Sequence, residues 1–406
     1  MNGSKEQIFD KNGEEILNPY YHKVSKRFRI AKNLVLVALV LYVFVMFWAF
    51  KDRITSENLQ YLLRNINMDI TAGGDSSGRL HYMVSDSATL LKYKDAIVVL
   101  DKEQLSFYDS FGNTTFTTDV GMDLPAIAVS DGYAMVYDIS GQEYKLYNAF
   151  SMIKSGEVSG SIVGAGTSPA GAFVLSIAKP GVSSEFLIYN NSLNLAASVK
   201  KKGYSACSAL SRDGKNAMLV TYDYSDSGKY LCTVDFIRCS DGKLLSSVTS
   251  EGSMPLKAWY TKDSIPMLYT YDGVLCFDEK GGLVTKVPID PERVIKFAFS
   301  DSGFALVYAD GYDRRHSRVQ WYDSKGKLSG TAEIDGVVTV IKHCLDSFVI
   351  CSGEKVFVVN SDSMAKTASD GHIVDVVEAR DGFYVCGYSK ADLVKFSDLD
   401  FEKHKE

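Results

Sequence analysis

One short run of side chains concentrates the groups that are best suited to bind an anion. Arg314, Arg315, His316 and Arg318 stand within five residues of one another, in a chain whose formal net charge is −6. Guanidinium groups bind carboxylates and phosphates through paired hydrogen bonds. We therefore predict a ligand-binding loop here. The alternative is a set of solvated loop charges, which is what such runs usually are.

The sequence predicts no catalytic residue, metal site or cofactor. The six histidines are scattered, although folding could bring His343 and Cys344 into one site. Residues 223–228 place two aspartates before a glycine. They lack the alternating acidic positions and the closing glutamate of an EF-hand loop, so a polar hairpin is favoured over a calcium site. A pair of carboxylates for glycoside hydrolysis is defined by a distance, which the sequence does not give.

An uninterrupted apolar run extends from Leu34 to Phe50 without a charge, a proline or a glycine. In a helix it would cover most of a hydrocarbon core about 30 Å thick. Basic residues crowd its N-terminal side, which places that side in the cytoplasm by the positive-inside rule. We predict a cytoplasmic tail at 1–29, and a transmembrane helix at 30–52 that contacts the lipid bilayer through residues 34–50. A buried core helix and a cleaved signal peptide are the alternatives.

The rest of the chain is then expected outside the cytoplasm, anchored in the cell membrane by this single pass. Residues 53–78 should form a short amphipathic helix and then a Gly-rich linker; the helix would carry on one face Leu59, Leu62, Leu63 and Ile66.

Charge and cysteine content restrict the partners and the covalent structure. Residues 1–33 carry about +3, which leaves about −9 for the remainder and argues against nucleic acid as a partner. All seven cysteines lie beyond the predicted span, and their odd number excludes a complete disulfide framework. Most cysteines stand in apolar runs and are expected as free buried thiols; a bridge between Cys344 and Cys351 across a hairpin is the alternative.

A repeat of strand, turn and strand fills the sequence after residue 79. Its turns are rich in Ser, Asp and Gly, as in Ser-Asp-Gly at 130–132 and Ser-Arg-Asp-Gly at 211–214. Aspartate caps such a turn, and glycine adopts the positive φ that other residues avoid. The turns fall near residues 92, 130, 168, 211, 261, 300, 344 and 379, a mean spacing of about 41. This period is typical of four-stranded propeller blades.

Eight turns therefore predict an all-β domain at 79–400, a β-propeller with eight blades, and seven is the alternative number. The last repeat ends before a fourth strand, while the segment from Leu80 to Ser85 precedes the first turn without a blade of its own. We expect this early segment to complete the last blade and close the ring, which removes a free sheet edge.

The repeats resemble those of TolB-like and WD40-like propellers, without the Trp-Asp signature. The whole layout is more specific: a basic tail, one span, the Ile-Thr-Ser-Glu-Asn-Leu segment at 54–59, a Gly-rich joint and a propeller. This layout resembles an uncharacterised family of clostridial membrane-anchored proteins, domain of unknown function 5711. The resemblance implies a fold and a location, and it brings no catalytic residues.

The function expected on these grounds is an extracytoplasmic platform that binds a protein or a cell-wall ligand, since propellers present variable loops on a rigid frame. A hydrolase or lyase acting on envelope polysaccharide, with carboxylates in the central channel, is the alternative. A sensor that signals through its cytoplasmic tail is a third reading. Three or more converging carboxylates would favour the enzyme, whereas an apolar or tyrosine-rich rim would favour binding.

Overall fold

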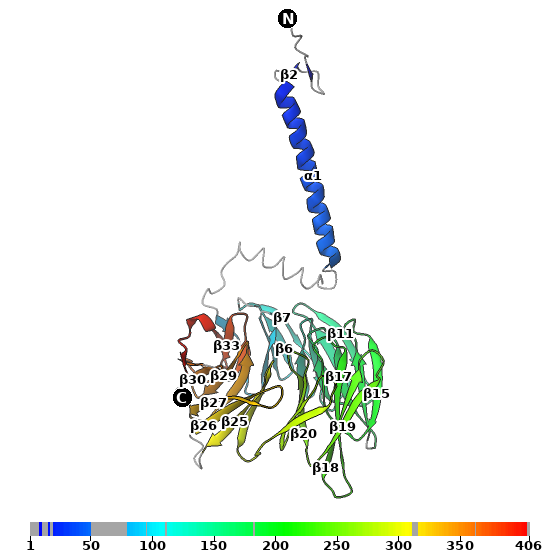
Figure 1. Ribbon diagram of the computed structural model, residues 1–406, viewed down its shortest axis with the longest axis vertical. Coiled ribbons are helices and arrows are strands. Elements are labelled where there is room, and N and C mark those ends of the chain that lie inside the picture. The colour runs from blue at the N-terminus through cyan, green and yellow to red at the C-terminus, as the bar shows by residue number, and fades with distance from the viewer. Residues whose placement is uncertain are drawn as a thin grey trace. The chain divides into compact units, whose positions relative to one another are not determined.

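The computed structural model describes residues 8–9, 15–16, 19–49, 79–94, 96–109, 112–181, 183–310, 316–361 and 363–403 (Figure 1). The chain divides into two compact units, Met1–Ala72 and Gly73–Glu406. The amphipathic helix and the Gly-rich linker predicted at 53–78 lie outside the described residues.

The described residues of the first unit form a long helix, α1 (Pro19–Ala49), preceded by the paired strands β1 (Ile8–Phe9) and β2 (Glu15–Ile16). The helix starts eleven residues before the predicted start at 30. Pro19 accounts for this earlier start, because the first position of a helix needs no backbone N–H and suits the fixed φ of proline. Within the described residues, no helix is both long enough and apolar enough to cross a membrane. The transmembrane helix therefore stays a prediction.

The second unit is an eight-bladed β-propeller, as predicted. Its described residues form eight antiparallel sheets, seven with four strands and one with five, and the first strands of successive blades contact one another around the centre. Blades 1 to 4 contain β4 (Thr89–Tyr93), β5 (Ala96–Asp101), β6 (Gln104–Tyr108) and β7 (Thr114–Asp119); β8 (Pro125–Val129), β9 (Ala134–Asp138), β10 (Glu143–Tyr147) and β11 (Met152–Glu157); β12 (Ser161–Thr167), β13 (Phe173–Lys179), β14 (Ser183–Tyr189) and β15 (Leu195–Lys202); β16 (Tyr204–Leu210), β17 (Asn216–Tyr224), β18 (Tyr230–Arg238) and β19 (Leu244–Glu251).

The other four blades repeat this order. Blades 5 to 8 contain β20 (Pro255–Tyr260), β21 (Pro266–Thr270), β22 (Gly273–Phe277) and β23 (Leu283–Pro288); β24 (Val294–Phe299), β25 (Gly303–Asp310), β26 (His316–Asp323) and β27 (Leu328–Asp335); β28 (Val340–Cys344), β29 (Ser347–Ser352), β30 (Lys355–Val359), β31 (Ser363–Ala368) and β35 (Glu402–Lys403); β32 (Asp375–Glu378), β33 (Gly382–Cys386), β34 (Lys390–Lys395) and β3 (Arg79–His81). A single 3₁₀ turn, η1 (Phe396–Asp398), follows β34.

Burial explains why the strands within a blade differ in composition. Every residue of β29 and β33 is buried, because a middle strand packs against neighbouring blades on both faces. The outermost strand β19 instead alternates between exposed and half-buried residues, since it forms the rim. The core consists of apolar clusters between consecutive blades, such as the one joining Val220 and Val234 of blade 4 to Leu268 and Leu275 of blade 5.

The repeated turn motif joins the first and second strands of every blade. Because strands alternate in direction, this turn and the turn between the third and fourth strands share one face of the ring, which we call the turn face. The second-to-third turns and the links between blades occupy the other face, the connection face. Positive φ confirms the expected role of glycine at Gly171 (φ 88°) and Gly214 (φ 69°).

At other turns the expected role of glycine is wrong. Gly303 and Gly382 lack a positive φ; a Cβ at these positions would instead overlap the carbonyl oxygens of Tyr322 and Val394 on the neighbouring strand. These turns need glycine because two backbones approach closely.

The ring closes through its first strand, as predicted. β3 pairs antiparallel with β34, and Arg79 Nε donates to Asp392 Oδ1 at 2.5 Å. Leu80, only 1% exposed, packs in one cluster with Leu90 and Ile97 of blade 1 and with Val377 of blade 8. β3 therefore stabilises the junction between the first and last blades.

The cysteines are all free, which agrees with the favoured interpretation of buried free thiols and excludes the alternative, a Cys344–Cys351 bridge. The two residues do lie on the hairpin of β28 and β29, but Cys344 pairs with Ser347 while Cys351 pairs with Val340. The two cysteines therefore stand at opposite ends of the hairpin. A longer turn would be needed to bring the two thiols opposite each other. Burial raises the pKa of the Cys351 thiol to about 12, so it behaves as a small apolar side chain.

Candidate functional site

A cavity of about 510 Å³ lies at the centre of the ring, where the innermost strands meet the turn face. All eight blades contribute to it, through residues that lie on β4, β8, β12, β16, β20, β24, β28 and β32 or in the turns that follow them. A site built in this way has a rigid frame, because each lining strand is the first strand of a packed sheet.

Apolar and polar side chains both contribute to the cavity wall. Ile127, Val129, Leu210, Trp259 and Phe299 are among the lining residues. Phe299 is 52% exposed, which is unusual for a phenylalanine on an inner strand. An exposed aromatic ring in a concave site is available to a ligand.

Trp259 adds a polar feature to this wall. Its ring lies 5.4 Å from that of Phe297 in an edge-on arrangement. Its indole Nε1 is buried and has no hydrogen-bond partner within the described part of the chain. An unpaired buried donor carries a desolvation cost, and such groups concentrate at functional sites.

Two cations reach the cavity. Lys257 on β20 is exposed and forms no ion pair with any described residue. Arg212 belongs to the first turn of blade 4, and its Nη1 lies 3.6 Å from Asp301 Oδ1 of blade 6. That distance is long for a charge-assisted hydrogen bond. Both cations therefore remain available to an anionic group.

The cavity lining contains two carboxylates, fewer than the three that would favour an enzyme. Besides Asp301, Glu378 on β32 contributes, and each of its oxygens has a partner. Lys92 Nζ donates to Glu378 Oε1 at 2.6 Å, and the backbone N–H of Leu345 donates to Oε2 at 3.2 Å. These contacts tie blade 8 to blades 1 and 7 and give Glu378 a structural role.

His343 is the histidine of this site. Its ring contacts that of Phe348 edge-on at 5.1 Å between centroids. Burial lowers the pKa of His343 below its ordinary value of 6.5, although Asp301, Glu378 and Asp346 act in the opposite direction. The imidazole is therefore neutral at pH 7 and can both donate and accept a hydrogen bond. The described residues contain no group of three or more His, Cys, Asp or Glu side chains that could hold a metal ion.

The predicted ligand-binding loop is at a different place. Arg314 and Arg315 lie outside the described residues. His316 and Arg318 belong to β26, next to the connection face, and do not line the central cavity. His316 is exposed, with Nδ1 3.3 Å from Asp335 Oδ1, and Arg318 is half-buried. The ligand-binding role of these four residues stays a prediction.

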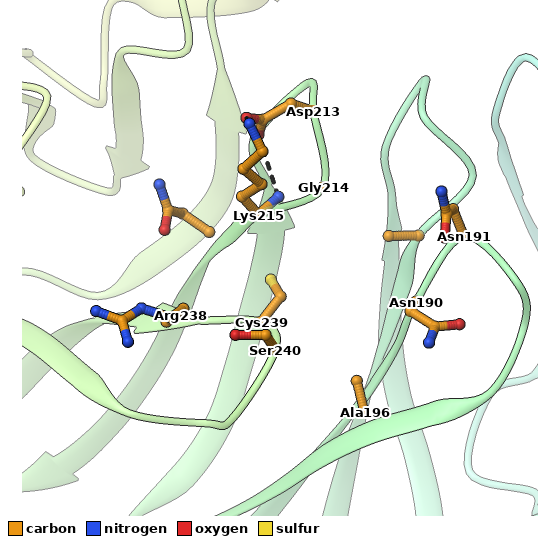
Figure 2. A pocket seen from close by; sticks show the side chains of 11 residues that line it. Asn190, Asn191, Ala196, Asp213, Gly214, Lys215, Arg238, Cys239 and Ser240 are labelled. Atoms are coloured by element: carbon orange, nitrogen blue, oxygen red, sulfur yellow. Dashed lines mark hydrogen bonds and ion pairs between the residues drawn. The ribbon is translucent and has the colours of Figure 1, made fainter.

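A second, larger cavity of about 690 Å³ lies between blades 3 and 4 (Figure 2). Asn190 and Asn191 line one side, and Asp213, Lys215 and Arg238 the other. Its cations are already paired, Lys215 Nζ with Asp213 Oδ2 at 3.1 Å and Arg238 Nη1 with Asp241 Oδ2 at 3.3 Å. Only two blades form this cavity, and its charges are neutralised locally, so the central cavity is the stronger candidate.

The fold and the central cavity define an eight-bladed β-propeller with a cation-bearing site of mixed polarity at its axis. The chain belongs to a family of unknown function, DUF5711, whose sequence profile matches residues 79–396. This confirms the family resemblance; the clostridial origin stays a prediction. No curated protein matches the chain.

Solved structures support the fold alone. Sqt1 of Saccharomyces cerevisiae is similar with a TM-score of 0.55 and 12% identity, over 78% of this chain and 100% of that one. BamB from Moraxella catarrhalis is similar with a TM-score of 0.50 and 10% identity, again over 78% of this chain and 100% of the other. At such identities the likeness is one of architecture.

Proposed function

We propose that this protein is a membrane-anchored, extracytoplasmic propeller that binds a protein or an envelope ligand at the central cavity of its turn face. The observation that carries the proposal is the cavity itself: all eight blades form its wall, which presents an exposed Phe299 and an unpaired Lys257. Concave sites that combine apolar surface with precisely placed polar groups are typical of ligand binding.

Charge favours a ligand that presents an anionic group. Lys257 has no counter-ion among the described residues, and Arg212 makes only a long contact. A carboxylate or a phosphate placed between them would gain charge-assisted hydrogen bonds. Phe299 and Trp259 would then pack against the apolar part of the same ligand.

The proposed membrane localisation rests on the apolar run from Leu34 to Phe50 and on its basic N-terminal flank. Protease added to intact cells tests it. We expect digestion of residues 80–400 in intact cells while a cytoplasmic control protein survives. Protection of the propeller under conditions that digest a known surface protein would overturn the proposed extracytoplasmic localisation.

Binding is tested by capture from detergent-solubilised envelope with the full chain, followed by quantitative mass spectrometry and by analysis of bound glycans. Phe299→Asp places a charge in the cavity and should reduce specific capture at least about tenfold, since it disrupts a buried apolar contact. Leu328→Asp is the matched control, because Leu328 is similarly exposed (46%) and lies on the outermost strand of the same blade. Equal capture by both variants and the parent chain would overturn the proposal.

An enzyme acting on envelope polysaccharide is the second candidate, because Asp301 and Glu378 both line the cavity. Reducing ends released from purified envelope polysaccharide would support it, provided that Asp301→Asn abolishes the release. The hydrogen bonds that hold Glu378 in a structural role favour the binding function instead.

A further inference from the structure

The outermost strands of the blades differ in whether they begin with a β-bulge. In blades 1 to 6 the register shifts by one residue close to the start of the outermost strand, on β7, β11, β15, β19, β23 and β27. A bulge disrupts the free edge of a strand and turns it away from further pairing. The outermost strand of the original four in blade 7, β31, pairs with β30 without any shift. Its outer edge is therefore regular over six residues.

The C-terminal strand of the chain occupies one end of this regular edge. Among the described residues, β35 pairs with β31 only at Ser363 and Met364. Glu402 of β35 is exposed, and Phe401 before it is 37% exposed, so little apolar contact holds this strand in place. A segment with so few contacts detaches at a small cost in free energy.

The rest of the edge is open. The four residues from Ala365 to Ala368 pair with no further strand within the described part of the chain. Backbone groups of successive residues point to opposite edges of a strand. Because the N–H of Ser369 donates to the carbonyl of Glu354 on the side of β30, the backbone groups of Lys366 and Ala368 point outward. These donors and acceptors are available to another extended segment.

Side chains along the open edge define which segment fits. Lys366 is exposed and forms no ion pair with any described residue, and its Nζ lies 5.6 Å from the centre of the Phe357 ring. Ala365, on the other face of the strand, is 1% exposed and belongs to the apolar cluster between blades 7 and 8. Directly opposite residues of an antiparallel pair share one face. An acidic residue opposite Lys366, followed by an apolar residue opposite Ala365, would therefore match both positions.

The C-terminal sequence contains this pattern but does not use it. If the register of β35 extended by one residue, Phe401 would stand opposite Ala365. The residue before it, Asp400, would then stand opposite Lys366. This pairing is absent from the described part of the molecule, because Leu399 packs against the cluster between blades 7 and 8 and holds the chain there. A free segment of the same chemistry has no such tether.

We propose that the outer edge of β31 is a strand-addition site for an extended segment of a protein partner, in which an acidic residue precedes an apolar one, and that this segment displaces β35. The segment would pair with six residues in place of two. Backbone hydrogen bonds would supply affinity, and the two side-chain positions would supply specificity. A second copy of the chain fits less well, since its own Leu399 restrains its C-terminal segment. The proposal does not depend on the central cavity.

The test uses the purified full chain in non-ionic detergent and a fluorescent peptide with the sequence of residues 398–406, Asp-Leu-Asp-Phe-Glu-Lys-His-Lys-Glu. Fluorescence anisotropy should show saturable binding. N-methylation of the second Asp of the peptide removes an N–H that would face β31 and should weaken binding at least about tenfold. N-methylation of the Phe is the matched control. Its N–H would point away from β31, so binding should weaken less than about twofold.

Two substitutions in the protein should change the affinity in opposite directions. Lys366→Glu places a like charge opposite the acidic residue of the peptide and should weaken binding about fivefold or more. Glu402→Pro removes a backbone N–H from the competing strand β35 and should tighten binding about threefold or more. Lys200→Glu is the matched control, because Lys200 is an exposed lysine on the outermost strand β15, and it should leave binding unchanged.

Thermal melting of each variant verifies folding, and the two N-methylated peptides keep the test decisive if Lys366→Glu is unstable. Absence of saturable binding, equal effects of the two N-methylations, or equal affinities of Lys366→Glu and Lys200→Glu would overturn the proposal. So would weaker binding to Glu402→Pro than to the parent chain. A dimer of the full chain that Lys366→Glu dissociates, measured by sedimentation equilibrium, would assign the edge to a second copy and would also overturn it.

Discussion

His343 is the residue whose protonation couples the central cavity to pH. Its imidazole is held neutral by burial, and the unfolded chain restores its ordinary pKa of 6.5. Below that pH the unfolded state binds a proton that the folded state resists, so unfolding becomes more favourable as pH falls. Above that pH the two states bind equally few protons and the effect disappears.

We therefore predict that the melting temperature of the parent chain falls more steeply between pH 7 and pH 5 than the melting temperature of His343→Gln. Glutamine keeps a polar side chain of similar size but does not titrate. The measurement is thermal unfolding of both proteins at half-unit pH steps. Parallel curves for the two proteins would contradict the role assigned to burial.

Charge at the residue scale also explains which functional groups could be found in the sequence. The basic run with Arg314 and Arg318 was conspicuous because its charges are adjacent. Lys257 and Phe299 were not, because nothing in the sequence marks β20 and β24 as inner strands whose side chains reach the axis.

At the scale of the elements, the first turn of each blade is the repeated unit. The motif positions predicted its location in all eight blades, because Ser, Asp and Gly together favour tight turns. The motif did not predict the backbone geometry. Leu345 adopts a φ of 54° without being glycine, and Gly303 lacks a positive φ. Close approach between strands, which depends on tertiary packing, accounts for Gly303.

A pair of alanine substitutions separates these two roles of glycine. Gly303→Ala should lower the free energy of unfolding by about 1–3 kcal/mol, because its Cβ would overlap the carbonyl oxygen of Tyr322. Gly132→Ala, at the corresponding turn of blade 2, should change it by less than about 0.5 kcal/mol, because nothing lies within 4 Å of its Cβ. Urea unfolding measures both; a similar cost at the two positions would contradict the steric explanation.

At the scale of the whole molecule, the stability of the ring depends on its closure. Leu80, the buried residue of β3, belongs to the apolar cluster between blades 8 and 1. An aspartate at this position would place an unpaired charge in that cluster, which costs several kcal/mol. We predict that the propeller of Leu80→Asp is not folded at 37 °C, so that heating the variant produces no cooperative unfolding transition.

Met83 provides the control for this prediction, because it follows in the same segment and is 83% exposed. Met83→Asp should melt like the parent chain. The readout is differential scanning calorimetry of the full chain. A cooperative transition of Leu80→Asp within about 2 °C of the parent would show that β3 is dispensable.

The number of blades followed from the repeat spacing, because each turn marks one sheet. The closure followed from the incomplete last repeat, which lacks a strand that the first segment can supply. Sequence spacing does not report contacts across the ring, such as the one between Arg212 and Asp301, and these depend on how the blades are arranged around the axis. The central site was therefore the part of the molecule that the sequence could not locate.

The pairing of β3 with β34 also sets a minimum time for completing the domain in a cell. Arg79 and its partner Asp392 are 313 residues apart in the chain. At a synthesis rate of about 5–20 residues per second, the ribosome needs roughly 16 to 60 s to make the second after the first. The first strand of the domain, β3, therefore stays unpaired until β34 has been synthesised. During that interval its backbone groups and Leu80 contact either solvent or a chaperone.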